Sequence, residues 1–138
     1  MRFTQGDLFW GMDIGFVKTV TDIAVHISCK QGEKLFDIGD PADHFYVLLK
    51  GSVTMERGKD QLYTAKHAGE IFGWSALIQR KDFAASATCG TDSEILKIAR
   101  DPFLTALSES PQNKATLFEH LAKKLGNQLL EVYIHATC

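Results

Sequence analysis

Residues 44–56 read HFYVLLKGSVTME, and this stretch decides the fold. Its first part, His44 to Lys50, is rich in the aromatic and β-branched side chains that favour a strand. Gly51 bends the chain before a second strand, and residues 57–60 have the composition of a hairpin turn. The pattern predicts that residues 61–67 return as the partner of the second strand.

Further strand patterns lie on both sides of this hairpin. They are expected at residues 23–28, 34–37, 84–89 and 94–100. Turn signals rich in glycine, proline and aspartate separate them, including Asp40-Pro41 and the tripeptide at residues 90–92. At least seven short strands with such turns are typical of a sandwich or of a jelly-roll barrel, also called a double-stranded β-helix.

Helices are expected to flank this mainly β barrel. Residues 6–21 predict a short N-terminal helical cap. Asp101-Pro102 predicts an N-cap and the first residue of a short helix that ends near Ser108. Ser110-Pro111 predicts, by the same logic, a long helix that runs to about residue 134. An apolar stripe at helical spacing follows it: Phe118, Leu121, Ala122, Leu125, Leu129 and Val132.

The length and composition favour a single cytoplasmic domain. The 138 residues suit one core, so we expect one domain over residues 1–138, with the barrel at about 23–100 and the C-terminal helices at about 102–134. The formal net charge of -2 offers no basic excess for nucleic acid or an anionic membrane. The N-terminus has no apolar secretory segment, and no apolar run is long enough to span a bilayer. The three cysteines form no CxxC pair, which predicts free thiols and no zinc site.

The stretch with the clearest chemical character is residues 68–77, followed by small residues at 84–87. A helical turn entered through glycine presents free backbone N–H groups, which suit an anion. We therefore expect a ligand between this turn and the later strand, bound by no cofactor or metal. The candidate ligand-binding residues are Phe72, Gly73, Trp74, Ser75, Ala76, Leu77, Phe83, Ala84, Ala85 and Ser86.

Three motifs carry a resemblance to a known family. Residues 32–43, GEKLFDIGDPAD, are similar to a G-E-x-x-F-x-x-G-D-x-x-D stretch, residues 46–53, YVLLKGSV, to a Y-x-[IVL]-x-x-G-x-[VA] strand, and residues 69–77, GEIFGWSAL, to the opening of a phosphate-binding cassette. Through these motifs, residues 8–134 resemble the cyclic-nucleotide-binding domains of catabolite-activator-type bacterial regulators. The resemblance implies a sensor barrel that binds a cyclic nucleotide such as cAMP and signals through its C-terminal helix.

The cassette departs from the family pattern at two positions. Trp74 stands where the family has a glutamate that accepts from the ribose hydroxyl, and Phe83 stands where it has an arginine that pairs with the cyclic phosphate. The two contacts together contribute roughly two to three orders of magnitude in affinity. Arg80 or Lys81, in the loop between them, is a candidate replacement for the arginine, although a solvated loop cation is the ordinary outcome.

Several side chains keep two interpretations open. Trp74 is either a stacking platform for a planar ligand or a plug that fills the cavity, and Phe83 is expected to pack against it. Ser75 and Ser86 are either hydrogen-bond partners of the ligand or local caps. The long helix at 111–134 is either a homodimer seam or a cover for its own barrel.

Two functional hypotheses follow. The first is a stand-alone regulatory sensor for a small anionic or planar ligand, with a cyclic nucleotide among the options. The second is a degenerate domain, no longer binding a ligand, that serves as a dimerisation or docking module. Because the chain ends before a helix-turn-helix, direct DNA binding is not expected. A cupin-like enzyme ranks last, because the five histidines form no HxH or HxxxH pair with an acidic partner.

Overall fold

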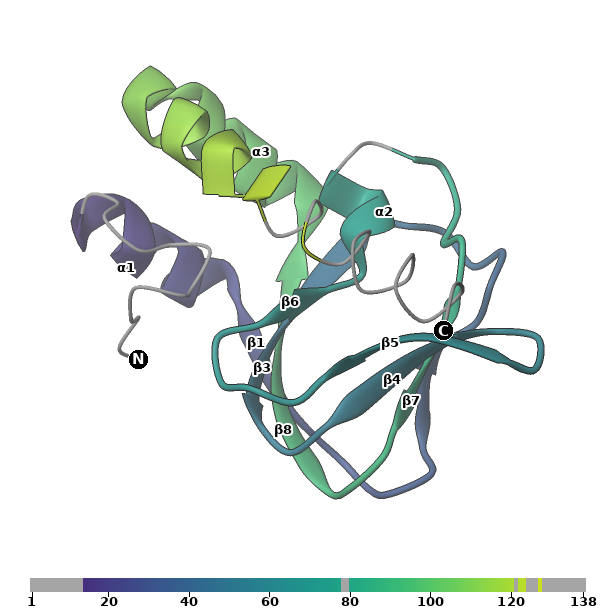
Figure 1. The fold of residues 1–138 in the computed structure, drawn as a ribbon. Helices are drawn as coiled ribbons and strands as arrows, with labels where there is room; N and C mark the ends of the chain where they lie inside the picture. Colours follow the sequence, from purple (N-terminus) through teal and green to yellow (C-terminus); the bar gives the residue numbers. More distant parts are fainter. Residues whose placement is uncertain (1–13, 78–79, 121, 124–126, 128–138) are drawn as a thin grey trace.

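The computed structural model describes residues 14–77, 80–120, 122–123 and 127, except for the side chain of Trp74. In this part of the chain, two four-stranded antiparallel sheets face each other and helices lie at one end (Figure 1). The elements are α1 (Ile14–Ile23), β1 (Val25–Cys29), β2 (Lys34–Phe36), β3 (His44–Lys50), β4 (Val53–Arg57), β5 (Asp60–Ala65), β6 (Ile71–Phe72), α2 (Trp74–Leu77), β7 (Ser86–Cys89), β8 (Ser93–Ala99) and α3 (Arg100–Ser108). The predicted mainly β jelly roll with flanking helices is confirmed.

The strand order explains how the barrel closes. One sheet runs β1-β8-β3-β6 and the other runs β2-β7-β4-β5, so every neighbouring pair except β4–β5 joins strands that are not consecutive in sequence. The predicted hairpin is present, with Val53 opposite Ala65 and Met55 opposite Tyr63. It forms because β4, whose alternate side chains Val53 and Met55 are buried, meets β5 at a turn of Gly58 and polar residues.

Strand β3 has four consecutive buried residues, Phe45 to Leu48, instead of an alternating pattern. Both of its faces are covered. The ring of Phe45 packs edge-on against Phe103 of α3, with centroids 4.8 Å apart, while Tyr46 stacks on Phe36 of the opposite sheet at 5.5 Å. Helices therefore cover the outer face of β3, and the barrel interior covers its inner face, which is why the strand reads as a continuous apolar run.

The N-terminal helix packs on the C-terminal part of the chain. Phe16 of α1 contacts Phe103 of α3 edge-on at 6.0 Å. The predicted helical cap at 6–21 is present as α1, but its first part lies outside the described residues. Ile23 ends this helix, so the prediction that a strand begins at this residue is wrong.

Helix α3 begins earlier than predicted. It starts at Arg100 with Ala99 as its N-cap and no side-chain cap, so the prediction that Asp101 is the N-cap is wrong. The turn before β3 supplies the missing contacts: the Arg100 backbone N–H donates to the Asp43 carbonyl and its Nη1 donates to the Ala42 carbonyl, both at 2.9 Å. Strand β8 therefore runs straight into the helix. The predicted end at Ser108 is confirmed.

A second helix follows at residues 111–120 and confirms the start signal at Ser110-Pro111. The Asn113 side chain donates to the Ser110 hydroxyl at 2.7 Å, and the Lys114 N–H donates to the Ser110 carbonyl at 3.0 Å. Leu117 is fully buried in the core, whereas Phe118 is 38% exposed. Of the predicted stripe, Phe118 and Ala122 are therefore exposed. Its other members lie outside the described residues: Leu121, Leu125, Leu129 and Val132.

Candidate ligand-binding site

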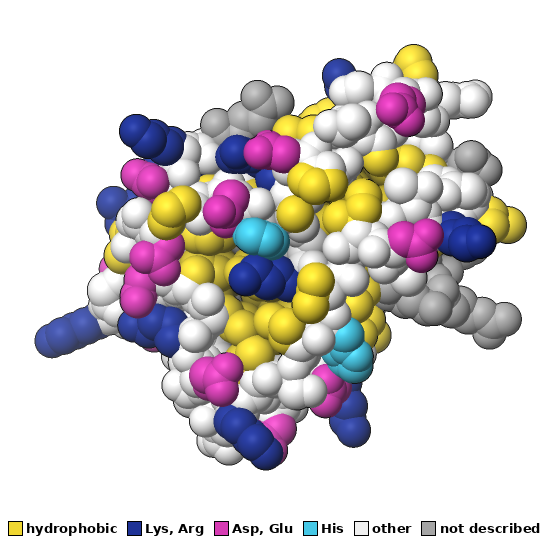
Figure 2. Space-filling model, turned by 180° about the vertical axis from the view of Figure 1, so that it is seen from behind, with side chains coloured by type: hydrophobic (Ala, Val, Ile, Leu, Met, Phe, Trp, Pro, Cys, Tyr) yellow, Lys and Arg dark blue, Asp and Glu magenta, His cyan; other side chains and the backbone are white. Residues whose placement is uncertain are grey.

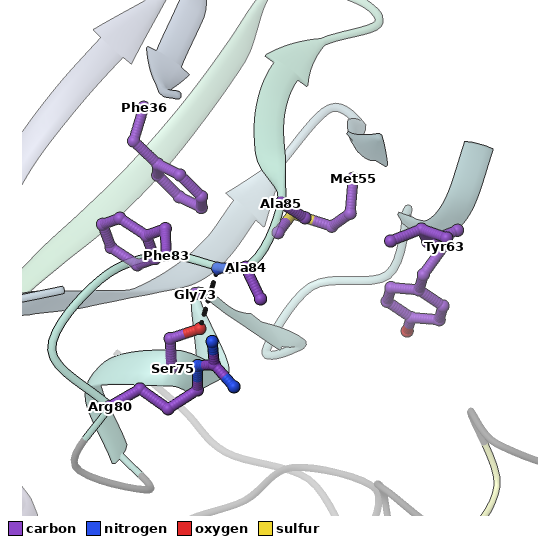
Figure 3. A pocket seen from close by; sticks show the side chains of 10 residues that line it. Phe36, Met55, Tyr63, Gly73, Ser75, Arg80, Phe83, Ala84 and Ala85 are labelled. Atoms are coloured by element: carbon purple, nitrogen blue, oxygen red, sulfur yellow. Dashed lines mark hydrogen bonds between the residues drawn. The ribbon is translucent and has the colours of Figure 1, made fainter. Parts of the chain in front are cut away.

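A cavity of about 300 Å³ lies between the β2-β7-β4-β5 sheet and the turn of α2 (Figure 3). This volume is at the lower end of the roughly 300–1,000 Å³ typical of small-molecule sites. Its walls come from four parts of the chain: the end of β2, the β4–β5 hairpin, the start of α2, and the loop that leads into β7. The lining residues are Phe36, Met55, Leu62, Tyr63, Gly73, Ser75, Arg80, Phe83, Ala84 and Ala85.

The entry into α2 requires glycine. Gly73 has φ +80°, and a Cβ at this position would lie 3.1 Å from the Tyr46 ring and 3.5 Å from the Phe45 Cα. Any other residue would be strained there and would push on the aromatic core. The close approach places the first turn of α2 against β3 and turns Ser75 toward the cavity (Figure 3).

Ser75 joins the helical turn to the loop before β7. Its side chain is 8% exposed, and its hydroxyl oxygen accepts a hydrogen bond from the Ala84 N–H at 3.3 Å. Residues 84 and 85 are bent and do not belong to β7, which begins at Ser86, although the sequence predicts a strand from residue 84. The bend arises because the Ala84 N–H bonds to a side chain and the Phe83 N–H bonds to the Asp40 carbonyl. Neither of these backbone N–H groups therefore donates to a neighbouring strand.

Phe83 belongs to a column of four aromatic rings across the barrel. It stacks on Phe36 with ring centroids 3.8 Å apart, Phe36 stacks on Tyr46 at 5.5 Å, and Tyr46 stacks on Phe72 at 5.2 Å. Burial raises the pKa of Tyr46 to about 12. The sequence predicts that Phe83 packs against Trp74, whose side chain lies outside the described residues. The ring that Phe83 contacts is that of Phe36.

Arg80 is the cation at the wall of this cavity. Its backbone N–H donates to the Ser75 carbonyl at 2.9 Å, and its guanidinium extends past Ser75 (Figure 3). No carboxylate pairs with this guanidinium in the described part of the chain. Lys81 is exposed and does not line the cavity, although its carbonyl accepts from the Ala42 N–H at 2.9 Å. Of the two cations that the sequence singles out, the structure brings Arg80 to the site.

The structure divides the predicted site residues into two groups. Those that line the cavity are Gly73, Ser75, Phe83, Ala84 and Ala85. Those that do not are Phe72, Ala76, Leu77 and Ser86. The first three of this second group are buried in the core, and the Ser86 hydroxyl accepts from the Ile38 N–H at 3.0 Å, which holds the loop after β2. Ser86 therefore makes a local hydrogen bond, which is one of the two roles predicted for it.

Four lining residues escaped the sequence reasoning: Phe36, Met55, Leu62 and Tyr63. They lie in strands or at strand ends of the β2-β7-β4-β5 sheet, outside the cassette motif at residues 69–77. Alternation along the β4–β5 hairpin is the signal that could have found two of them, because Met55 and Tyr63 are paired across it.

The described residues contain no group of three or more His, Cys, Asp or Glu side chains that could hold a metal ion. Glu94 is occupied by structural contacts, accepting from Ser28 and bonding to His26, each at 2.7 Å. These bonds, that from Ser28 above all, lower the pKa of Glu94. Among the described residues, no helix has the length and apolar character needed to cross a membrane.

Comparison with known proteins places this geometry in context. The family model for the cyclic nucleotide-binding domain matches residues 26–110. The CRP-like cAMP-activated global transcriptional regulator of Mycobacterium tuberculosis is 23% identical over 125 residues, which cover 88% of this chain and 56% of that protein. The cAMP-dependent protein kinase regulatory subunit of Debaryomyces hansenii is 28% identical over 118 residues, covering 84% of this chain and 26% of that protein. The chain thus spans about half, or less, of these relatives.

Solved structures show the same fold. The Catabolite Activator Protein of Thermus thermophilus superposes with a TM-score of 0.76 at 25% identity, covering 94% of this chain and 62% of that one. A cyclic nucleotide-binding domain from Methylobacillus flagellatus superposes with a TM-score of 0.78 at 20% identity, covering 92% of this chain and 74% of that one. The resemblance found in the sequence motifs is confirmed by these matches.

Proposed function

Because this chain belongs to the cyclic nucleotide-binding domain family, we propose that it is a regulatory sensor domain whose barrel binds a small anionic or planar ligand. The relatives described above regulate transcription or a protein kinase, and neither role is catalytic. The observation that carries the proposal is the cavity at the position of the cassette, with a guanidinium on its wall that pairs with no carboxylate among the described residues. We assign the chain no enzymatic activity and place it in the cytoplasm.

A cyclic nucleotide is one candidate ligand. The cassette lacks the family's ribose glutamate and phosphate arginine, at the positions of Trp74 and Phe83. Arg80, in the same loop as Phe83, supplies a positive charge at the cavity wall and can pair with a phosphate in a bidentate manner. Nucleotide binding in this arrangement is weaker than in a complete cassette, because one contact is relocated and the other is lost.

Signalling is proposed to pass through the C-terminal helices. Strand β8 runs without a break into α3, and residues 111–120 follow after a two-residue turn. A ligand shifts these helices only if it binds one arrangement better than another. The cavity wall and β3 are connected by the aromatic column, and Phe45 of β3 contacts Phe103 of α3 at 4.8 Å. This contact gives the ligand site a physical connection to the helices.

The long helix at 111–134 is proposed to form a homodimer. Phe118 and Ala122 belong to the predicted stripe and are exposed, while Leu117 on the same helix is used by the chain's own core. Figure 2, seen from behind, shows hydrophobic side chains at the surface over the helices as well as over the barrel. Light scattering of wild type and Phe118→Lys tests the seam: the variant is expected to be monomeric. An unchanged mass would assign this face no role in assembly.

No DNA contact is part of the proposal. On the face in Figure 2, Lys and Arg side chains are interspersed with Asp and Glu, which gives no basic surface there. The formal net charge of -2 agrees with this.

The first experiment is thermal unfolding with and without millimolar cAMP or cGMP. A ligand present at about one hundred times its dissociation constant stabilises the folded state by about 2.7 kcal/mol, which raises the midpoint by several degrees. A rise with either nucleotide supports the proposal for this ligand class. No rise with either one removes cyclic nucleotides of ordinary affinity.

One observation favours a second candidate, a docking module that binds no ligand. The Phe83 ring stacks at 3.8 Å on Phe36 and is 4% exposed, so it fills part of the space where the family arginine would reach its phosphate. The cavity that remains distinguishes the two candidates. A ligand of any class that binds there argues against the docking module.

A further inference from the structure

The lining of the cavity is chemically uneven. Most of its wall is apolar, formed by the rings of Phe36 and Phe83 and by the side chains of Met55 and Leu62 together with two alanines. Arg80 is the one charged residue in the described lining, which therefore carries a net positive charge. An apolar chamber with a single convergent cation selects ligands that have both features.

The polar side chains of the lining are already engaged. The Ser75 hydroxyl oxygen accepts from the Ala84 N–H at 3.3 Å, and the Tyr63 hydroxyl donates to Glu70 Oε2 at 2.7 Å. The described lining contains no carboxylate to accept hydrogen bonds from sugar hydroxyls. A ribose in this chamber would bury hydroxyl groups against Phe, Met and Leu side chains, and each unmatched hydroxyl costs roughly 1–3 kcal/mol.

The geometry points to a small monoanion with a compact apolar or aromatic body as the ligand of this cavity, in place of a sugar-containing nucleotide. We infer that its anionic group lies against Arg80, beside Ser75, and that its apolar body lies between Phe83, Met55 and Leu62. This inference rests on the proposed function, because it takes the cavity to be a ligand site. It adds the class of ligand.

The single positive charge and the limited volume of the cavity both restrict which ligands fit there. Arg80 has no carboxylate partner in the described chain, so a bound anion gains a bidentate charge-assisted pair without breaking an existing one. A cavity of about 300 Å³, at the lower end of the range for small-molecule sites, has room for a bicyclic aromatic acid or a medium-chain fatty acid. A second negative charge would have no cation to meet within the described lining.

The test is calorimetric titration of the full chain with four probes: 1-naphthoate, its neutral analogue 1-naphthamide, octanoate and cAMP. At least one carboxylate is expected to bind, and naphthoate is expected to bind about 10- to 100-fold more tightly than naphthamide, as a charge-assisted pair predicts. Arg80→Gln is expected to remove this preference while leaving the naphthamide affinity unchanged. Lys81→Gln is the matched control, since it removes the adjacent loop cation that does not line the cavity.

A further variant locates the binding. Ala84→Phe fills the cavity from a partly exposed position and is expected to abolish binding of every probe, while a circular dichroism spectrum like that of wild type shows that the chain is folded. Binding that survives Ala84→Phe lies elsewhere and overturns the inference.

The remaining outcomes distinguish a failure of the inferred ligand class from a failure of the proposed function. If cAMP binds and neither carboxylate does, the sensor function stands and the inferred ligand class is wrong. If naphthoate and naphthamide bind equally, or Lys81→Gln matters as much as Arg80→Gln, the role of Arg80 is wrong. If none of the four probes binds the folded wild type, the inference and the ligand-binding function both fail, and the docking module takes their place.

Discussion

Replacing Phe83 with arginine puts a guanidinium at the position that, by the resemblance of the sequence motifs, corresponds to the family's phosphate-binding arginine. The Phe83 side chain is 4% exposed and stacks on Phe36 at 3.8 Å. Burial of a phenylalanine contributes about 1.5–3 kcal/mol, and a stacked pair adds about 0.5–1.5 kcal/mol. The longer arginine can reach the cavity and keep its charge solvated there, so we expect Phe83→Arg to lower the free energy of unfolding by about 2–4 kcal/mol.

The same substitution is expected to improve cAMP binding. A charge-assisted contact to the cyclic phosphate contributes about 1.5–3 kcal/mol, or about a tenfold to a hundredfold gain in affinity. The measurements are urea unfolding for stability and calorimetry for affinity, with Phe83→Leu as the control. The leucine keeps an apolar side chain in place and loses only the ring stack, so it should cost less stability and give no gain in affinity.

Either of two results would refute this reasoning. An unfolding free energy equal to that of wild type would mean that Phe83 does not contribute to the core. A stable variant whose affinity for cAMP is unchanged would mean that position 83 does not face the phosphate, and that the cassette of this chain does not align spatially with that of the family.

Three further substitutions or modifications test the packing. Gly51→Ala is expected to destabilise the fold by about 2–4 kcal/mol, because Gly51 has φ +104° and a Cβ there would overlap the Ser93 side chain. Gly58→Ala, at φ +64° with open space around it, is the control and should cost only about 1–2 kcal/mol in urea unfolding; equal losses would contradict the overlap. Tyr46→Phe should reduce the alkaline loss of stability: the buried phenol, with a pKa of about 12 instead of 10.0, holds its proton in the folded state while the unfolded chain releases it, so stability is retained below pH 10 and falls by up to about 3 kcal/mol as pH approaches 12. Identical pH profiles of unfolding for both proteins would exclude this origin. Burial, and then the neighbouring thiol of Cys89, raises the pKa of Cys29 to about 12. Iodoacetamide at pH 8 should therefore label Cys29 only after unfolding, as followed by mass spectrometry. Rapid labelling of the native chain would show that this thiol is accessible.

The sequence predicted the strands well because their signal is local. Strand β3 has the predicted bounds of His44 to Lys50, since its run of aromatic and aliphatic side chains favours a strand by itself. Helix start signals succeeded at Ser110-Pro111 and failed at Asp101-Pro102. Just before Asp101-Pro102, Arg100 is held by carbonyl groups of a turn nearly sixty residues earlier in the chain, and that tertiary contact shifts the helix start.

The site was predictable only in part. The cassette motif located the turn of α2 and the loop at residues 83–85, and five of the predicted residues line the cavity. Residues on the opposite wall come from the β4–β5 hairpin, and no local pattern says that this hairpin lies across from the cassette. The sequence also could not predict that Arg80 lines the cavity, because the hydrogen bond from its backbone N–H to the Ser75 carbonyl depends on how the loop folds.

The column of aromatic rings gives the barrel an intrinsic spectroscopic signal. Of the three tyrosines in the chain, Tyr46 is sandwiched between Phe36 and Phe72, with centroids 5.5 and 5.2 Å away. An aromatic side chain held in a fixed asymmetric setting gives a near-ultraviolet circular dichroism signal, which disappears when packing loosens. A molecule entering beside Phe83 that tilts this ring also tilts Phe36 and thereby alters the surroundings of Tyr46. Occupancy of the cavity is therefore readable as an intrinsic tyrosine signal, without a dye or label attached to the chain.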